Sequence, residues 1–182
     1  MNTRSATPFD QDTPASTEPR HYRPKLLFYH ANAKGSGSAA QFECYAASGD
    51  QEGRIFVSMA PQRHVAEDGQ NATFDWKNKV VVKLGFSDLS ALLLVLNGRI
   101  AELGDGKGLY HDSKSSTTII RLAKQADPYS GYAFELSRKP KEGNETISRV
   151  RIVFSDAEAY GLACALEQSM GLIAFGDCMA CR

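Results

Sequence analysis

Several features that mark enzymes, membrane proteins and secreted proteins are missing from this chain of 182 residues. The longest apolar run, residues 89–96 with Ser90 inside it, is far shorter than the ~20 residues that cross a bilayer. Four cysteines do not make a disulfide framework in a chain of this length. There is no Gly-Lys-Ser/Thr phosphate loop, no Gly-x-Ser-x-Gly elbow and no His-x-x-x-His pair. The sequence therefore predicts a non-enzymatic protein with no membrane partner, cofactor or metal.

An excess of charge of either sign is also absent, since 21 Lys and Arg balance 21 Asp and Glu. The balance hides an uneven distribution, because residues 1–19 carry Asp10, Asp12 and Glu18 against Arg4 alone. The rest of the chain is therefore mildly basic. Mild basicity neither requires nor excludes an anionic partner. Whether the chain binds one depends on where the fold places the cations.

The first 24 residues are rich in Pro, Ser and Thr. We expect a disordered tail there, because little apolar surface is available to offset the entropy of ordering. The tail lacks the apolar core of a secretory signal, and its acidic residues do not fit a transit peptide, so a cytoplasmic or nucleoid location is expected. Residues 25–176 are predicted to form one domain, and residues 177–182 a C-terminal tail.

The chain repeats its own pattern. Phe-Tyr-His at residues 28–30 returns as Leu-Tyr-His at residues 109–111, an offset of 81. Phe-Ser-Asp at residues 86–88 returns at residues 154–156, an offset of 68, and both times it precedes an apolar helix-like segment. An internal repeat of this kind outweighs local propensity in predicting the fold. We predict an α+β protein made of a tandem ββββα repeat, with repeats at about residues 25–104 and 107–176.

The predicted elements follow the same order in both copies. Pro61 is expected to end a strand, and Ser87 and Ser155 to be helix N-caps, with Asp88 and Asp156 in the first turns. Both helices are apolar almost all round, which predicts burial in a core or a subunit interface, and hence an oligomer. The predicted strands are residues 25–30, 39–46, 54–60, 77–86, 116–124, 132–138 and 146–154, and the predicted helices run from residue 87 to about 102 and from 157 to about 172.

Cations recur on one face of the last strand of each repeat. Period-two alternation places Lys79 and Lys83 on one face and, in the second copy, Arg149 and Arg151. With the 68-residue offset, Lys83 corresponds to Arg151. Phosphates meet Lys and Arg, while unstacked bases lie on aromatic rings at ~1–3 kcal/mol per base, so such a face suits a single-stranded nucleic acid. A merely solvated outer face is an equally weighted alternative from composition and spacing alone.

Other candidates have two readings each. Trp76 stacks a base or plugs the edge of the core, Phe56 and Phe134 are expected to be split between surface and core, and the repeated His30 and His111 are hydrogen-bonded turn residues or ligands. Cys178 and Cys181 are expected to be incidental or a labile disulfide. The predicted nucleic-acid-binding residues are Tyr29, Lys34, Phe56, Trp76, Lys77, Lys79, Lys83, Tyr110, Lys114, Arg121, Lys124, Arg149 and Arg151.

Three segments resemble the Whirly family of single-stranded DNA-binding proteins. Residues 74–84, which contain Asp75-Trp76, look like the Tyr-Asp-Trp strand before the family's first helix. Residues 109–114 are similar to its aromatic-His-Asp-Pro stretch, with Ser113 in place of Pro. Residues 34–40 resemble its Lys-Gly-Lys-Ala-Ala motif, interrupted by Gly37-Ser38. The resemblance covers roughly residues 25–176.

This resemblance implies two packed antiparallel four-stranded sheets with helices, and a homotetramer assembled through the helices. It implies binding of single-stranded DNA, with RNA as the alternative, along sheet surfaces and between protomers, with little sequence preference. Without a plant-type leader, a bacterial or phage protein is expected. The competing hypothesis is a tandem-repeat oligomerisation or small-ligand module without nucleic-acid affinity.

Overall fold

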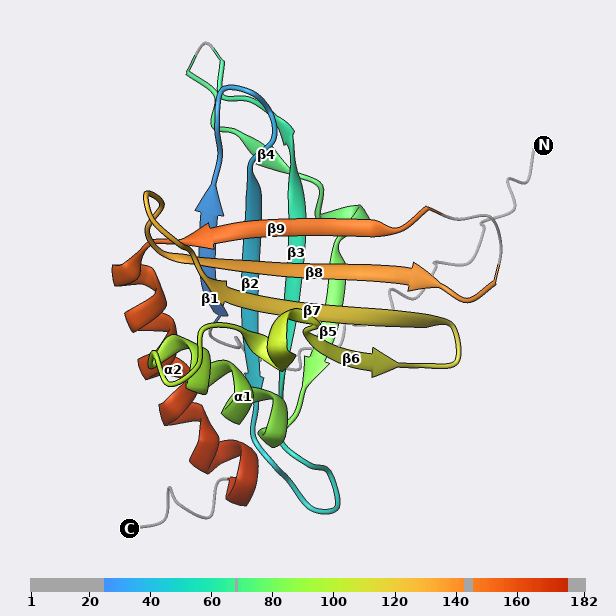
Figure 1. Cartoon of the computed structure of the whole chain (residues 1–182). Helices are drawn as coiled ribbons and strands as arrows, with labels where there is room; N and C mark the ends of the chain where they lie inside the picture. Colours follow the sequence, from blue (N-terminus) through green and yellow to red (C-terminus); the bar gives the residue numbers. More distant parts are fainter. Residues whose placement is uncertain (1–24, 68, 143–145, 177–182) are drawn as a thin grey trace, which may run out of the picture.

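A computed structural model describes residues 25–67, 69–142 and 146–176 of the chain. It has the predicted α+β composition, with strands preceding a helix in each half (Figure 1). The first half consists of β1 (Lys25–His30), β2 (Ser38–Tyr45), β3 (Arg54–His64), β4 (Thr73–Phe74), the 3-10 helix η1 (Trp76–Asn78), β5 (Val80–Leu84) and α1 (Phe86–Leu96). The second consists of the 3-10 helix η2 (Leu103–Gly106), β6 (Leu109–Asp112), β7 (Ser116–Lys124), β8 (Tyr132–Pro140), β9 (Ser148–Phe154) and α2 (Asp156–Phe175).

The strands form two antiparallel sheets, each built from one repeat. The second sheet has the predicted four strands in the order β6-β7-β8-β9. The first has five, because its fourth position is divided between β4 and β5, which both pair with β3. The predicted strand at residues 77–86 is therefore shorter, and Trp76 and Lys77 lie in η1 between the two pieces. The Asp75 carboxylate caps this short helix by accepting a hydrogen bond from the Asn78 amide at 3.3 Å.

The prediction that Pro61 ends the third strand is wrong. Strand β3 continues to His64, because β4 pairs with its far end and the Asp75 amide donates to the Pro61 carbonyl at 2.9 Å. Proline lacks an N–H but keeps its carbonyl, so it can lie in a strand where only that carbonyl is needed.

The two sheets pack face to face, with the strands of one crossing those of the other (Figure 1). Alternating residues of β5 and β9 point inward, as predicted, and Val80, Val82, Val150 and Ile152 are buried. Aromatic rings join the repeats into one core. Phe28 lies 4.8 Å from Phe154, and Phe42 lies 6.1 Å from Phe134, between ring centroids. Phe134 is thus a core residue and Phe56 is not, the split that the sequence predicted.

The helices differ from the predicted ones at their ends. Gly85 and not Ser87 is the N-cap of α1, and the Asp88 carboxylate accepts a hydrogen bond from the Gly85 amide at 2.8 Å. Helix α1 stops at Leu96, before Glu102, and is followed by Gly98 at a φ of +68°. Ser155 caps α2 as predicted, in a reciprocal capping box with Glu158. This helix extends to Phe175.

The structure corrects the alignment of the repeats at their ends. Asp88 and Glu158 both occupy the third position of their helices, so the structural offset there is 70 and not 68. In the sheets, Val81 pairs with Ser58 and Arg151 with Glu135, at corresponding places. Lys83 therefore corresponds to Val153 and not to Arg151. The Phe-Ser-Asp match misled because helix caps favour the same small set of residues at neighbouring positions.

Reciprocal polar contacts hold the two repeats together. His30 of the first repeat bonds to the Glu158 carboxylate at 2.8 Å, and His111 of the second to the Asp88 carboxylate at 2.9 Å. Partial burial alone raises the pKa of Glu158, but hydrogen bonds from His30 and Ser155 outweigh it and hold that pKa below its ordinary value. Both histidines are hydrogen-bonded as predicted, but to the start of the opposite helix and not within a turn.

Apolar side chains of both helices remain exposed in a single chain. The inner sides of α1 and α2 are buried, while Leu94, Tyr160 and Phe175 are 47%, 74% and 67% exposed. The core covers only part of each helix, so burial of the remaining apolar side chains in a subunit interface stays a prediction. In the part of the chain that the structure describes, no helix is long and apolar enough to cross a membrane.

The described cysteines, Cys44 and Cys164, are free thiols. Within residues 25–67, 69–142 and 146–176, no group of three or more His, Cys, Asp or Glu is placed to hold a metal ion. The predicted tails, residues 1–24 and 177–182, lie outside the described residues together with Cys178 and Cys181.

Candidate nucleic-acid interface

Most of the candidate residues are divided between the outer faces of the two sheets and their loops. Because the inner faces pack against each other, the outer faces point away from one another. The cations that recur in the two repeats therefore belong to two separate surfaces. The first sheet and its loops carry Tyr29, Lys34, Phe56, Trp76, Lys77, Lys79 and Lys83, and the second carries Tyr110, Lys114, Arg121, Lys124, Arg149 and Arg151.

An aromatic hollow lies at one end of the first outer face. Tyr29 alternates with the buried Phe28, so its ring points outward, and it is 55% exposed. Its centroid lies 5.5 Å from that of Phe74, which β4 presents beside the end of β3. Together with Trp76 these rings line an open hollow of about 560 Å³, completed by Ala31, Asn71, Ala72 and Thr73. The structure thus unites Tyr29 and Trp76, and it places Trp76 at the surface hollow and outside the core cluster.

The β1–β2 loop beside this hollow is held by a buried amide. The Gln62 side chain, only 8% exposed, accepts hydrogen bonds from the amides of Asn32 and Gly37 at 2.9 and 3.1 Å. It donates to the carbonyls of Asn32 and His64 at 3.0 and 3.2 Å. The Asn32 side chain in turn accepts from the amides of Lys34 and Ser36. Lys34 therefore stands exposed on a loop whose backbone is fixed.

A second group lies at the other end of the same face. The centroid of the Phe56 ring is 5.3 Å from that of the Tyr45 ring. The Arg54 guanidinium lies 5.4 Å from the Tyr45 centroid and 5.8 Å from the Phe56 centroid. Lys83 pairs with Phe56 across the sheet and is exposed. Phe56 and Lys83 therefore lie side by side on the first outer face. Arg54 and Tyr45 lie beside them. Their contact could not be predicted from the sequence, because a cation and a ring on separate strands meet only when the strands pair.

The outer face of the second sheet is mainly cationic. Arg121 and Arg149 share one countercharge, with nitrogens 3.2 Å and 3.4 Å from the Glu135 carboxylate. They line a small hollow of about 230 Å³ together with Thr117, Ile119, Ser137, Lys139 and Ile147. Tyr110, 59% exposed, pairs with Ile119 at the edge of this face. Two of the predicted arginines are thus brought together, although Glu135 offsets part of their charge.

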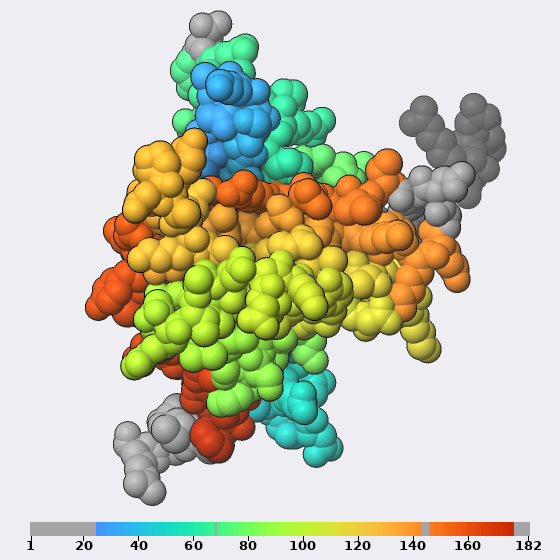
Figure 2. Space-filling view, viewed as in Figure 1, coloured from blue at the N-terminus to red at the C-terminus, as the bar shows by residue number. Residues whose placement is uncertain are grey.

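Arg151 is the cross-strand partner of Glu135, but none of the ion pairs among the described residues involves it. It lines an open hollow of about 580 Å³ with Ser36, Gln125, Tyr129 and Val153. Tyr129, from the β7–β8 loop, is 70% exposed. Ser36 belongs to the first repeat, so this hollow is formed by both repeats. In the space-filling view, atoms of the β7–β8 loop, gold, lie against those of the first repeat, blue (Figure 2).

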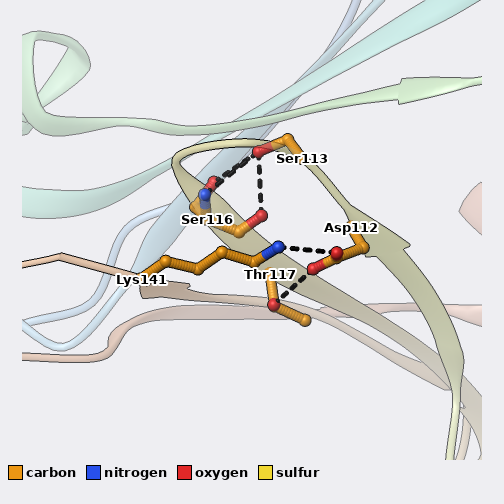
Figure 3. Close-up of polar contacts among 5 residues, drawn as sticks. All are labelled: Asp112, Ser113, Ser116, Thr117 and Lys141. Atoms are coloured by element: carbon orange, nitrogen blue, oxygen red, sulfur yellow. Dashed lines mark hydrogen bonds and ion pairs between the residues drawn. The ribbon is translucent and has the colours of Figure 1, made fainter.

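The turn between β6 and β7 is fixed by polar contacts (Figure 3). The Asp112 carboxylate accepts from Lys141 Nζ at 2.6 Å and from the Thr117 hydroxyl at 2.8 Å. These contacts, the one with Lys141 first, hold the pKa of Asp112 below its usual value. Ser113 bonds to Ser116 across the turn. Lys114 is exposed in this turn.

Three further predicted lysines do not lie on an outer face. Lys77 lies in η1 and Lys79 directly after it, both exposed near the aromatic hollow. Lys124 has the same parity as the buried Ile120 and Leu122, so it ends β7 on the opposite side from Arg121. The structure adds Phe74, Tyr129 and Lys139 to the candidates. Phe74 directly precedes Asp75-Trp76, so it could have been chosen from the sequence. No pattern in the sequence singles out Tyr129, which lies in a loop.

Sequence comparisons find no matching protein-family model and no matching curated protein. Comparison of structures finds similar folds. WHY1 from Arabidopsis thaliana matches with a TM-score of 0.69 at 18% identity, over 90% of this chain and 92% of that one. WHY3 from the same plant matches with a TM-score of 0.68 at 20% identity, over 90% and 95%. The plant transcriptional regulator PBF-2 matches with a TM-score of 0.60 at 20% identity, over 82% and 84%.

The duplicated architecture of two crossed sheets and two helices defines a two-repeat α+β fold with exposed sheet faces. The comparisons identify this fold as the Whirly fold. The resemblance read from the sequence is thereby confirmed at the level of the fold.

Proposed function

We propose that this protein is a non-enzymatic single-stranded nucleic-acid-binding protein with little sequence preference, and that DNA is its preferred partner. The observation that carries the proposal is the open hollow of Tyr29, Phe74 and Trp76 on the outer face of the first sheet. Tyr29 is exposed and the other two rings are half-buried, and rings grouped in this way with cations beside them suit unpaired bases.

Stacking accounts for the expected preference for single strands. A base can lie on a protein ring only when it is unstacked from its neighbours, and a duplex keeps its bases paired and stacked. Every base has a flat aromatic face, so contacts of this kind discriminate little between sequences. The Whirly fold supports this proposal, since the resemblance of residues 74–84 is to a family of single-stranded DNA-binding proteins.

Exposed cations beside the aromatic hollow and on the second outer face supply the phosphate contacts. Lys77 and Lys79 are exposed near the aromatic hollow, and Arg149 and Arg151 are exposed on the second face. The formal net charge of the whole chain is +0, so attraction has to come from these local groups. Binding is therefore expected to weaken as salt rises, because phosphate contacts release counterions.

We also infer that copies of the chain associate through their helices, with a tetramer favoured. The exposed Leu94, Tyr160, Leu172 and Phe175 support this, because large apolar side chains gathered on two adjacent helices indicate a covered surface.

The test uses Trp76, which is the sole tryptophan of the sequence. Its intrinsic fluorescence is recorded while oligo-dT, the matching duplex and a matched RNA are added, across a series of salt concentrations. We expect quenching by the single strand, weakened by salt, and little change with the duplex. A second labelled oligonucleotide followed by anisotropy reports binding that bypasses Trp76. If neither the fluorescence of Trp76 nor the anisotropy changes at low salt, the proposal is wrong.

A small-ligand module is the second candidate, and one cavity favours it. An apolar hollow of about 290 Å³ lies between the first sheet and α2, lined among others by Phe42, Cys44, Ile55 and Leu166. Its size suits a small apolar molecule. This candidate predicts that an apolar dye binds there and that oligo-dT neither displaces it nor quenches Trp76.

A further inference from the structure

The hollow that contains Arg151 has the chemistry of a nucleotide site. It presents a cation, a highly exposed tyrosine ring, an amide from Gln125 and a hydroxyl from Ser36 around about 580 Å³. An arginine is suited to a phosphate, and a tyrosine ring to the face of a base. None of the described ion pairs involves Arg151, in contrast to Arg121 and Arg149, which share Glu135.

This hollow adjoins the aromatic hollow through a single loop. Ala31, at the start of the β1–β2 loop, lines the aromatic hollow, and Ser36, near the end of that loop, lines the Arg151 hollow. Lys34 lies between these two residues along the loop, and its side chain is exposed. The loop is fixed by Gln62 and Asn32, so the two hollows keep their relative position.

We propose that the hollow of Ser36, Gln125, Tyr129, Arg151 and Val153 is a nucleotide subsite, in which Arg151 binds a phosphate and Tyr129 stacks a base. A single strand seated in the aromatic hollow reaches it by crossing the β1–β2 loop past Lys34. The bound strand thereby passes from the first repeat to the second within one protomer. This inference rests on the proposed function and adds the path that the strand takes.

The path makes the effect of Tyr129 depend on the length of the ligand. A short oligo-dT of about 4 nucleotides can fill the aromatic hollow alone, whereas one of about 16 can cover both hollows. Tyr129→Ala is therefore expected to weaken binding of the long oligonucleotide about tenfold, as expected for the loss of one stacked base. Quenching of Trp76 by the short oligonucleotide is expected to stay unchanged, which also shows that the variant is folded.

The effects of the Arg151 and Tyr129 variants are distinguished by the salt dependence of binding. For a single strand, each phosphate contact contributes about 0.7 to the slope of log K against log salt concentration. Arg151→Gln is expected to reduce that slope by about 0.7 for the long oligonucleotide and by nothing for the short one. Tyr129→Ala is expected to leave the slope unchanged, because stacking releases no counterion.

Two matched variants serve as controls. Tyr129→Phe keeps the ring and is expected to restore binding, and Arg99→Gln removes an exposed cation that lies outside both hollows. If the wild-type protein binds long oligo-dT but Tyr129→Ala and Arg151→Gln bind it equally well, the subsite is wrong and the proposed function stands. If the wild-type protein binds neither oligonucleotide, the proposed function itself fails.

Discussion

The two repeats share a backbone, yet their outer faces differ in chemistry. The first presents rings, with Tyr29, Phe74 and Trp76 around one hollow. The second presents cations, with Arg121 and Arg149 around a shared carboxylate. Inward positions must fill one common core, whereas outward positions meet only solvent or a ligand. Duplication of a fold therefore fixes the buried pattern and leaves the chemistry of each outer face free to differ; we propose mainly stacking on the first face and mainly phosphate contact on the second.

The loops at corresponding ends of the repeats differ in the same way. The β1–β2 loop is held by the buried Gln62 side chain, and the β6–β7 turn by the exposed pair of Asp112 and Lys141 (Figure 3). Buried hydrogen bonds are costly to remove because water cannot replace them, while exposed ion pairs contribute little. The first loop should thus be the more rigid platform.

The largest expected effect separates these two loops. Gln62→Leu removes four hydrogen bonds to the backbone of Asn32, Gly37 and His64. It is expected to lower the free energy of unfolding by about 2–3 kcal/mol, because buried amides and carbonyls lose their partners. Urea denaturation measures it. The control is Lys141→Gln, which removes the exposed ion pair with Asp112 in the β6–β7 turn. We expect no measurable change for it, and equal effects of the two variants would contradict the comparison.

Stacking on the first face gives the next effect. Tyr29→Ala and Phe74→Ala are each expected to weaken binding of oligo-dT by roughly 1–3 kcal/mol, with an unchanged salt slope. Tyr110→Ala on the second face should have a smaller effect, since Tyr110 has no ring neighbour among the described aromatic contacts. Anisotropy titrations at several salt concentrations measure both. A larger loss for Tyr110→Ala would reverse the roles assigned to the two faces.

The contacts between the repeats predict a dependence on pH. The pKa of Glu158 lies below its ordinary value of 4.5 in the folded protein, so the carboxylate stabilises the fold above that pH. This stabilisation is lost as pH falls through the folded pKa. Glu158→Gln should therefore lower the free energy of unfolding by about 1 kcal/mol at neutral pH, as for loss of a helix cap.

The difference between wild type and Glu158→Gln should shrink in acid, and thermal unfolding at pH values on either side of 4.5 measures it. Asp88→Asn removes the corresponding contact with His111 and is the matched variant. A constant difference at all pH values would contradict the assigned contact.

The smallest effect sharpens the description of the cationic face. Glu135→Gln frees Arg121 and Arg149 from their shared countercharge. Binding of oligo-dT is expected to strengthen by about 0.5–1 kcal/mol, with a steeper salt slope. Glu43→Gln on the first face, which releases only the pair with Lys25, is the matched control. Weaker binding by Glu135→Gln would mean that the carboxylate positions the arginines for phosphate.

Most of the fold could be predicted because its buried pattern is local. The alternation of Val80, Val82 and Leu84 with exposed residues is visible in the sequence and determines which side of the strand faces the core. Breaks in that pattern were harder to predict. The division of the fourth strand by η1 depends on the hydrogen bond from the Asn78 amide to the Asp75 carboxylate. The extension of β3 past Pro61 depends on pairing with β4, which follows it along the chain.

The sequence by itself determined the duplicated α+β architecture, the inward and outward sides of the strands, and the residue types available for binding, because periodicity and repetition are properties of neighbouring residues. Only the tertiary structure decided the true alignment of the repeats, the division of the cations over two faces, and the meeting of Tyr29 with Trp76 and of Arg151 with Tyr129. These pairs lie on different elements, and strand pairing and sheet packing alone bring them within reach. Distances between such elements depend on how the whole core packs, and no local pattern records that.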